Sequence, residues 1–77
     1  MGGKPRPSPC YLDGFEVIKV NGGRKIWRSD DKESLFTWDS LHGEIEVFNM
    51  RGRHLGVLDP VTGKMIKKAI KGRKLDV

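Results

Sequence analysis

The sequence has little of what a metalloprotein, a membrane protein or a large enzyme needs. Cys10 is its single cysteine, which excludes an internal disulfide and a thiolate metal cage. No apolar run approaches the roughly 20 residues that span a bilayer, and no signal-peptide pattern appears. A chain of 77 residues that is only 36% hydrophobic has no room for a large buried cofactor pocket. We therefore expect one small domain with no cofactor and no metal.

The first 13 residues have the composition of a linker. Prolines at positions 5, 7 and 9 hold the backbone extended, and no hydrophobic periodicity is present. We expect residues 1–13 to be a flexible Pro/Gly-rich linker or a cloning remnant, with Cys10 as a linker thiol. Residues 14–77 would then form the domain.

From Phe15 onward, apolar and polar residues alternate with a period of two, which is typical of strands that bury one side. Clusters of Asn, Asp, Gly and Pro separate six such segments, and connections this short make neighbouring strands antiparallel. The sequence predicts a mainly β fold, a twisted antiparallel sheet in meander order that follows an extended N-terminal segment. The predicted strands span residues 15–20, 25–28, 35–39, 44–49, 54–58 and 64–68.

Charge is unevenly distributed along this basic chain. Fifteen Lys and Arg residues against ten Asp and Glu residues give a net charge of +5. Six of the acidic residues lie between positions 30 and 46, and six basic residues lie between positions 64 and 74. A uniformly basic surface would suit passive phosphate binding, but an acidic cluster repels the polyanion that the rest attracts. The cluster therefore indicates either chemistry or a solvated turn.

The acidic segment predicts a hairpin with residues 40–43 as its loop. Because side chains alternate along a strand, the core face of this hairpin would carry Phe36, Trp38, Ile45 and Val47. The opposite face would carry three cross-strand pairs, with His42 in the loop beside them. These pairs are Asp39 with Glu44, Thr37 with Glu46, and Leu35 with Phe48.

Two carboxylates beside an imidazole suit the cleavage of RNA. Ribose carries its own nucleophile, so the enzyme needs a base for the 2′-hydroxyl, an acid for the leaving 5′-oxygen, and cations for the developing charge. Glu46 is the candidate base, because neighbouring carboxylates disfavour its ionised form, and the same negative field favours the imidazolium of His42. By spacing alone, a solvated turn is the commoner explanation of such a cluster.

Two motifs carry a resemblance to a known family. Residues 38–46 (WDSLHGEIE), followed by His54-Leu55-Gly56 and by DPVTG at residues 59–63, resemble the nuclease domain of cloacin and the ribosome-cleaving colicins. Contact-dependent inhibition toxins use this domain as well. The resemblance covers about residues 21–77. It implies a highly twisted antiparallel sheet with at most a short N-terminal helix. It also implies a toxin that cuts 16S ribosomal RNA in the decoding centre without a metal, leaving a 2′,3′-cyclic phosphate.

The resemblance assigns roles to individual residues. The family's catalytic residues fall on Asp39, His42, Glu46 and Arg73. Glu46 would be the base, His42 the acid or charge stabiliser, and Asp39 the group that orients His42. Arg73 would clamp the phosphate with its planar fork. The roles of Glu46 and His42 can be exchanged. Contacts to RNA are expected from Lys67, from the basic tail and from Phe48, which replaces a family tyrosine and would stack a base. The tail residues are Lys64, Lys68, Lys71 and Lys74.

The resemblance also implies partners. These are the ribosome as substrate and an acidic immunity protein in the producing cell. We expect a monomeric domain without membrane binding, secreted or delivered at the cell surface and acting in the cytoplasm of target bacteria. Two alternatives from other classes are a non-catalytic basic RNA-binding module and an interaction domain for an acidic protein. For Trp27 and Trp38, a core position and a stacking platform are both open, whereas His54 is expected on the surface of an edge strand.

Overall fold

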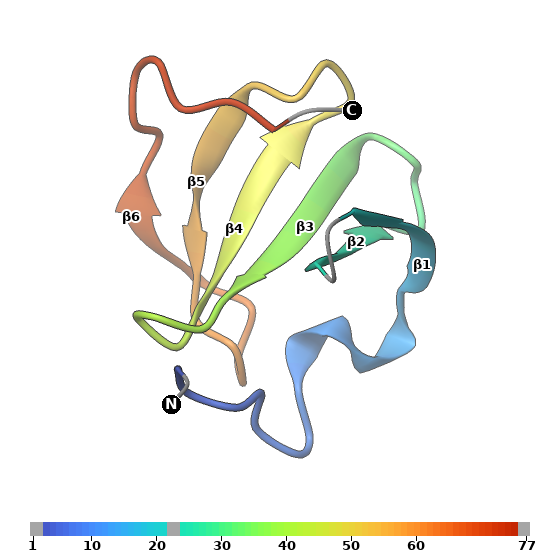
Figure 1. Ribbon diagram of the computed structural model, residues 1–77, viewed down its shortest axis with the longest axis vertical. Helices are drawn as coiled ribbons and strands as arrows, with labels where there is room; N and C mark the ends of the chain where they lie inside the picture. Colours follow the sequence, from blue (N-terminus) through green and yellow to red (C-terminus); the bar gives the residue numbers. More distant parts are fainter. Residues whose placement is uncertain (1–2, 22–23, 76–77) are drawn as a thin grey trace.

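Six strands follow one another in sequence order in the computed structural model, which describes residues 3–21 and 24–75 (Figure 1). All neighbouring strands are antiparallel, so the predicted meander is confirmed. The turn expected at Gly22-Gly23 lies outside the described residues. Every observed strand begins and ends within one residue of its predicted bounds. The strands are β1 (Glu16–Asn21), β2 (Arg24–Arg28), β3 (Ser34–Asp39), β4 (Glu44–Asn49), β5 (His54–Leu58) and β6 (Met65–Lys68).

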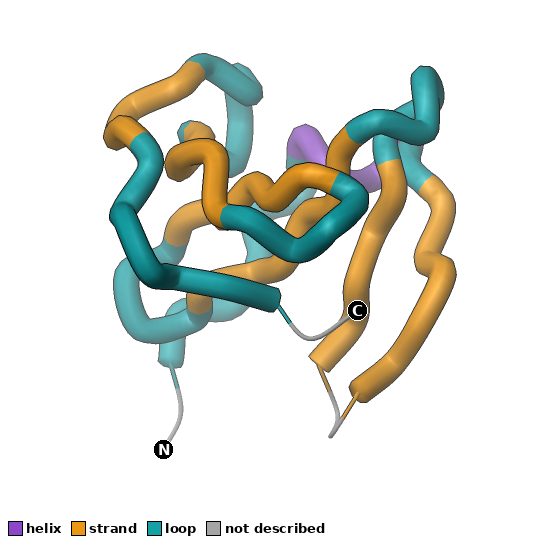
Figure 2. Tube along the Cα trace, turned by 90° about the horizontal axis from the view of Figure 1, so that it is seen from above, coloured by secondary structure: helices purple, strands orange, loops and turns teal. Residues whose placement is uncertain are grey.

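A single turn of 3-10 helix, η1 (Tyr11–Gly14), precedes the sheet and accounts for the short-helical segment that the resemblance implied. In the part of the chain that the structure describes, no helix has the length and apolar character needed to cross a membrane. The sheet is strongly curved when it is viewed from above (Figure 2). This curvature lets one small sheet enclose side chains on both of its faces.

Two of the turns are built on the same pattern, an aspartate followed by a glycine four positions later. The N–H of Gly43 donates to the carbonyl of Asp39 at 2.7 Å, and the N–H of Gly63 donates to the carbonyl of Asp59 at 2.9 Å. Both glycines have positive φ, 69° and 75°, a conformation that a side chain disfavours. In both turns the aspartate Oδ1 accepts the N–H groups two and three residues later.

The sheet buries apolar side chains on both faces. The larger cluster contains three of the four residues expected in the core, Phe36, Ile45 and Val47, while Trp38 is half-buried against it. A smaller cluster on the opposite face contains Ile26, Leu35 and Phe48, with Leu75 packed on it. The period-two pattern predicted only the larger one. The remaining members of the larger cluster are Cys10, Leu12, Trp27 and Leu58.

The N-terminal segment packs against the sheet. Leu12 is fully buried and Cys10 is 6% exposed within the larger cluster. The N–H of Lys4 donates to the carbonyl of Ser40 at 2.6 Å, and the carbonyl of Lys4 accepts the indole N–H of Trp38 at 2.9 Å. Cys10 is therefore a core residue and not the linker thiol that we expected. The physical reason is that this face of the sheet is apolar, and within residues 3–21 and 24–75 the N-terminal segment with η1 is what covers it.

The chain after β6 turns back and runs across the sheet toward the end of β4 and the beginning of β3 (Figure 1). The N–H of His54 donates to the carbonyl of Arg73 at 3.2 Å, and the N–H of Leu75 donates to the carbonyl of Gly52 at 2.7 Å. This returning segment covers the smaller cluster, where Phe48 is 3% exposed. It also carries Arg73 to the face on which the acidic side chains lie.

Candidate active site

The hairpin of β3 and β4 has the predicted register. Cross-strand partners, and every second residue along a strand, point to the same face. Asp39, Glu44 and Glu46 therefore project together, and Glu46 lies about 7 Å further along β4 than Glu44. The observed pairs are Asp39 with Glu44, Thr37 with Glu46, and Leu35 with Phe48. Local alternation thus places the carboxylates on one face without any long-range contact.

Asp39 uses its two carboxylate oxygens differently. Oδ1 accepts the backbone N–H groups of Leu41 and His42, at 3.0 and 3.2 Å, and so shapes the turn. Oδ2 accepts the Nδ1–H of His42 at 2.8 Å. The carboxylate side chain is 17% exposed, whereas the imidazole is 57% exposed. Because Nδ1 is held by Asp39, Nε2 is the ring nitrogen that can exchange a proton with a bound substrate.

The pKa of Asp39 lies below its ordinary value. Burial acts against this by disfavouring the charged form, but the hydrogen bond from the His42 ring, the backbone N–H of His42, the charge of His42 and the N–H of Leu41 together outweigh it. Asp39 therefore stays ionised at neutral pH. An ionised Asp39 accepts hydrogen bonds only, which keeps the proton on Nδ1 of His42.

Glu46 lies between two nitrogen-bearing side chains. Its Oε1 forms an ion pair with Nη1 of Arg73 and lies 3.3 Å from Nε2 of His54. The carboxylate side chain is 13% exposed. The sequence interpretation considered only the neighbouring carboxylates of Glu46, whereas the structure adds contacts with Arg73 and His54. Among the described residues the recorded contacts all use Oε1, so Oε2 is the oxygen that can accept a proton.

His54 is the site residue that the sequence interpretation missed. We expected it on an edge strand, but β6 pairs with β5 and its side chain is 0% exposed. The N–H of Ile70 donates to Nδ1 of His54 at 2.9 Å, so the neutral ring carries its proton on Nε2, toward Glu46. Nε2 forms no hydrogen bond with any described residue. The sequence did offer one indication of a role for His54, because His54-Leu55-Gly56 is among the residues that carry the family resemblance.

The pKa of His54 is lowered. Burial is the main cause, because it disfavours the imidazolium, and the charge of Arg73 acts in the same direction while the charge of Glu46 opposes it. Protonation of Nδ1 would also displace the hydrogen bond from Ile70. His54 is therefore neutral at neutral pH, so it places no positive charge beside Glu46.

The expected RNA-binding lysines lie beside the acidic face and beyond it. Lys67 is on β6, and its Nζ donates to Oε1 of Glu44 at 3.0 Å. This ion pair ties the basic tail to the acidic hairpin. The other four lysines of the expected set are exposed to solvent, and they are Lys64, Lys68, Lys71 and Lys74.

The aromatic side chains are less available than the sequence suggested. Phe48 is 3% exposed, packs in the smaller cluster and meets the His54 ring edge-on, with 5.3 Å between ring centroids. Its ring has no free face for a base, which corrects the stacking role that we expected. Trp27 is 5% exposed, with the guanidinium of Arg6 at 5.0 Å from its ring centroid, and is a core residue.

One cluster has the donor atoms for a metal ion. Asp39, His42 and Glu44 each offer a ligand atom, and these atoms lie within 4.8 Å of one another. Two carboxylates and an imidazole are ligands that divalent transition ions accept. The same groups are engaged in the protein itself, since Asp39 binds His42 and Glu44 binds Lys67. Activity measured after the removal of divalent ions distinguishes a metal-binding role of this cluster from its role in contacts within the protein.

Comparison with known proteins supports the resemblance. A model of the protein family described as Cytotoxic matches residues 12–76. Cloacin from Escherichia coli is 47% identical over 47 residues, which are 60% of this chain and 8% of cloacin. Colicin E3 from Escherichia coli is 46% identical over 52 residues, which are 64% of this chain and 9% of colicin E3. Colicin E6 from Escherichia coli is 40% identical over 47 residues, 60% of this chain and 8% of that protein. The chain thus matches less than a tenth of the length of each relative.

Proposed function

The chain belongs to the Cytotoxic family, and on this basis we propose that it is a colicin-like toxin domain that cleaves 16S ribosomal RNA in the decoding centre. The observation that carries the proposal is that Asp39 and Glu46 lie on one face of the β3–β4 hairpin, with His42 bound to Asp39 and Arg73 bound to Glu46. The Asp39–His42 pair lies at the loop end of the hairpin. The Arg73–Glu46 pair lies about 7 Å from that end, because Glu46 is two residues further along β4 than Glu44, the partner of Asp39. In the proposed complex the ribose and its 3′-phosphate lie between these two groups.

Cleavage begins at the 2′-hydroxyl of the ribose. Glu46 takes the hydroxyl proton on Oε2, and the resulting oxyanion attacks the adjacent phosphorus. His42, protonated at Nε2, donates that proton to the leaving 5′-oxygen. The P–O5′ bond breaks as the bond between O2′ and phosphorus forms. The products are a 2′,3′-cyclic phosphate and a 5′-hydroxyl, and water returns both residues to their starting protonation states.

Cationic side chains stabilise the charge that develops on the phosphate. Arg73 contacts Glu46 through Nη1, and its guanidinium has further N–H groups for the phosphate oxygens. Lys67 adds positive charge beside Glu44. Base, acid and charge stabiliser are all supplied by side chains, so the reaction requires no metal ion. The assignment of base and acid can be exchanged between Glu46 and His42 without changing the residues involved.

A net charge of +5 favours both ribosomal RNA and an acidic immunity protein, which neutralises the domain in the producing cell. The domain acts in the cytoplasm of a target bacterium after delivery from outside.

Incubation with purified ribosomes tests this function. We expect the full chain to produce one cut in the decoding region, detected by primer extension, with a cyclic phosphate on the upstream fragment. His42→Ala and Glu46→Gln should each abolish the cut while the circular dichroism spectrum stays unchanged. Ribosomal RNA that is bound but left intact by the wild-type chain would reject the enzyme and favour the RNA-binding module.

A further inference from the structure

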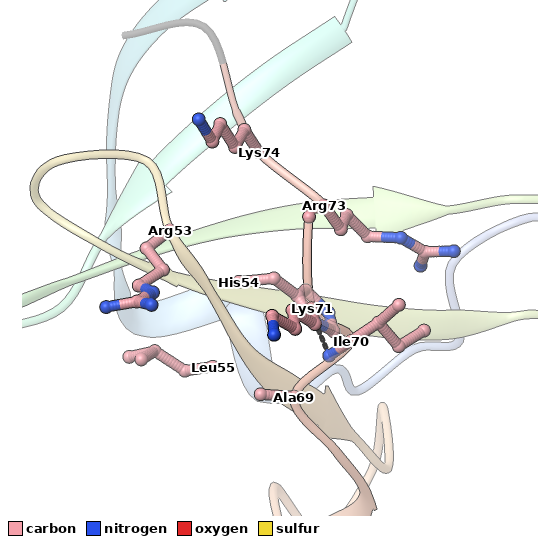
Figure 3. Close-up of a pocket in the computed structure, with 9 residues that line it drawn as sticks. Arg53, His54, Leu55, Ala69, Ile70, Lys71, Arg73 and Lys74 are labelled. Carbon is pink, nitrogen blue, oxygen red and sulfur yellow. Dashed lines mark hydrogen bonds between the residues drawn. The ribbon is translucent and has the colours of Figure 1, made fainter.

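A cavity of about 660 Å³ lies next to the catalytic face, between the beginning of β5 and the segment that returns from β6 (Figure 3). His54 and Arg73 belong to its lining, and both also contact Glu46. The cavity therefore shares two residues with the site proposed above. The proposed chemistry uses none of the other side chains in its lining. These side chains belong to Arg53, Leu55, Ala69, Ile70, Lys71 and Lys74.

Hydrogen bonds to β5 and within the returning segment hold the wall of this cavity in place. The N–H of Ile70 donates to Nδ1 of the fully buried His54 at 2.9 Å, and this bond is drawn in Figure 3. The N–H of Arg73 donates to the carbonyl of Ile70 at 3.2 Å, and Arg53 forms a β-bridge with Lys74. A wall that is fixed before the ligand arrives loses little conformational entropy on binding.

The lining combines positive charge with apolar surface. Arg53, Lys71, Arg73 and Lys74 are cationic, and the lining contains no carboxylate. In the described chain, the recorded ion pairs include neither Arg53 nor Lys71. Leu55 and Ile70 keep 38% and 44% of their surface exposed. A bare phosphate would use the cations alone, whereas a nucleotide has an anionic phosphate and a largely apolar base face for both kinds of surface.

We propose that this cavity binds the nucleotide next to the scissile bond, with its base against Leu55, Ala69 and Ile70 and its phosphate on Arg53 and Lys71. The inference rests on the proposed ribonuclease function and names a subsite of that site. Arg73 extends away from Arg53 and Leu55 in Figure 3, and it contacts Glu46. Arg73 thus lies between Glu46 and the cavity. We therefore expect one phosphate of the RNA strand at Arg73 beside Glu46 and the adjacent phosphate in the cavity on Arg53 and Lys71.

Binding of an uncleavable strand tests the subsite separately from catalysis. The probe is a short single-stranded oligonucleotide made of 2′-deoxyribose, which lacks the nucleophile, and a second probe is its abasic form. Ala69→Phe fills the cavity from an exposed position. We expect Ala69→Phe to weaken binding of the probe with bases about tenfold, the amount expected when one base loses its apolar contact area. Binding of the abasic probe should change less than twofold.

A charge variant tests the phosphate contacts. Arg53→Ala with Lys71→Ala should lower the slope of log affinity against log salt by about 1.4, which corresponds to two lost phosphate contacts on a single strand. The matched control is Lys19→Ala with Arg24→Ala, one lysine and one arginine on β1 and β2 at the far edge of the sheet. This control should leave the slope within about 0.3 of the wild-type value.

Three outcomes would overturn the subsite. In the first, Ala69→Phe affects both probes equally or neither. In the second, the control pair changes the slope as much as Arg53→Ala with Lys71→Ala does. In the third, a poly-glutamate peptide competes for the cavity with the same dependence on Ala69→Phe, which would assign it to an acidic protein. Failure of ribosome cleavage by the wild-type chain would reject the proposed function whatever these oligonucleotides do.

Discussion

Asp39 and Asp59 build the same turn with the same backbone hydrogen bonds, but only Asp39 has a histidine three residues later. The residue at the matching place after Asp59 is Thr62, which uses its hydroxyl to accept the N–H of Lys64 at 3.2 Å. The two aspartates therefore make a natural pair for separating a structural role from a catalytic one. In both turns Oδ1 serves the backbone, and at Asp39 the second oxygen orients His42.

Replacement of these two aspartates should have unequal effects on activity. Asparagine keeps the Oδ1 acceptor, so Asp39→Asn and Asp59→Asn should both leave the turns and the melting temperature nearly unchanged. Asp39→Asn loses the charge that holds the proton on Nδ1 of His42, and we expect ribosome cleavage to fall about 100-fold or more. Asp59→Asn should cleave at the wild-type rate. Equal rates for the two variants would show that Asp39 serves only the turn.

Arg73 should matter for catalysis far more than for stability. The Arg73 side chain is 42% exposed, and ion pairs at such positions contribute at most about 1 kcal/mol to the free energy of unfolding. Removal of a charge stabiliser lowers rates about tenfold or more, so Arg73→Ala should show this loss in single-turnover cleavage. Arg73→Lys should recover only part of it, because lysine lacks the planar fork. A loss of rate that parallels a loss of folded protein in urea titrations would contradict this role.

Stability should fall on mild acidification because of His54. The pKa of folded His54 is lowered, so the unfolded state binds the proton more readily once the pH drops below the ordinary value of about 6.5. The contribution of His54 is fully present above that pH and is lost as the pH falls toward the pKa of the folded state. His42→Ala leaves His54 as the single histidine, since the sequence has two. In this background the urea midpoint should decrease between pH 7.0 and 5.5.

Two measurements check the assignment of this acid sensitivity. His54→Asn in the same background keeps an acceptor for the N–H of Ile70 and should remove the decrease between pH 7.0 and 5.5. An NMR titration of the imidazole in the His42→Ala chain reports the pKa of His54 directly. An imidazole that titrates at or above pH 6.5 would refute the buried neutral histidine beside Glu46.

The N-terminal segment should contribute strongly to stability. Leu12 has no exposed surface, so Leu12→Ala leaves a cavity and should lower the free energy of unfolding by about 2–5 kcal/mol. This is a large part of the stability of a domain of this size. Leu41→Ala is the matched control, because Leu41 is 76% exposed and its truncation should change stability by less than about 0.5 kcal/mol. Chemical denaturation of both variants gives the comparison, and equal midpoints would mean that the segment is a dispensable linker.

Chelation should leave ribosome cleavage unchanged. In the proposed mechanism the base, the acid and the cations are side chains, so EDTA is expected to have no effect on the initial rate, and added magnesium should not be required. Glu44→Gln removes one donor from the candidate metal cluster without touching His42 or Glu46, and it should keep activity within about threefold of wild type. Loss of activity in EDTA together with loss in Glu44→Gln would replace this mechanism with a metal-assisted one.

The sequence alone determined the parts of this protein that depend on near neighbours. Alternation with a period of two predicted the strands and the register of the β3–β4 hairpin, because a slip by one residue would move every side chain to the other face. Aspartate and glycine at a spacing of four encode the turn that joins Asp39 to His42. The motifs identified the family for the same reason, since they lie within short stretches of chain.

Only the tertiary structure decided what covers each face of the sheet. The N-terminal segment buries Cys10 and Leu12 on one face, and the return after β6 buries Phe48 and His54 and brings Arg73 to Glu46. Alternation along a strand tells which side a residue faces but carries no information about a distant segment that packs on it. For that reason a histidine expected at the surface lies buried beside Glu46, and a phenylalanine expected to stack on RNA belongs to the core.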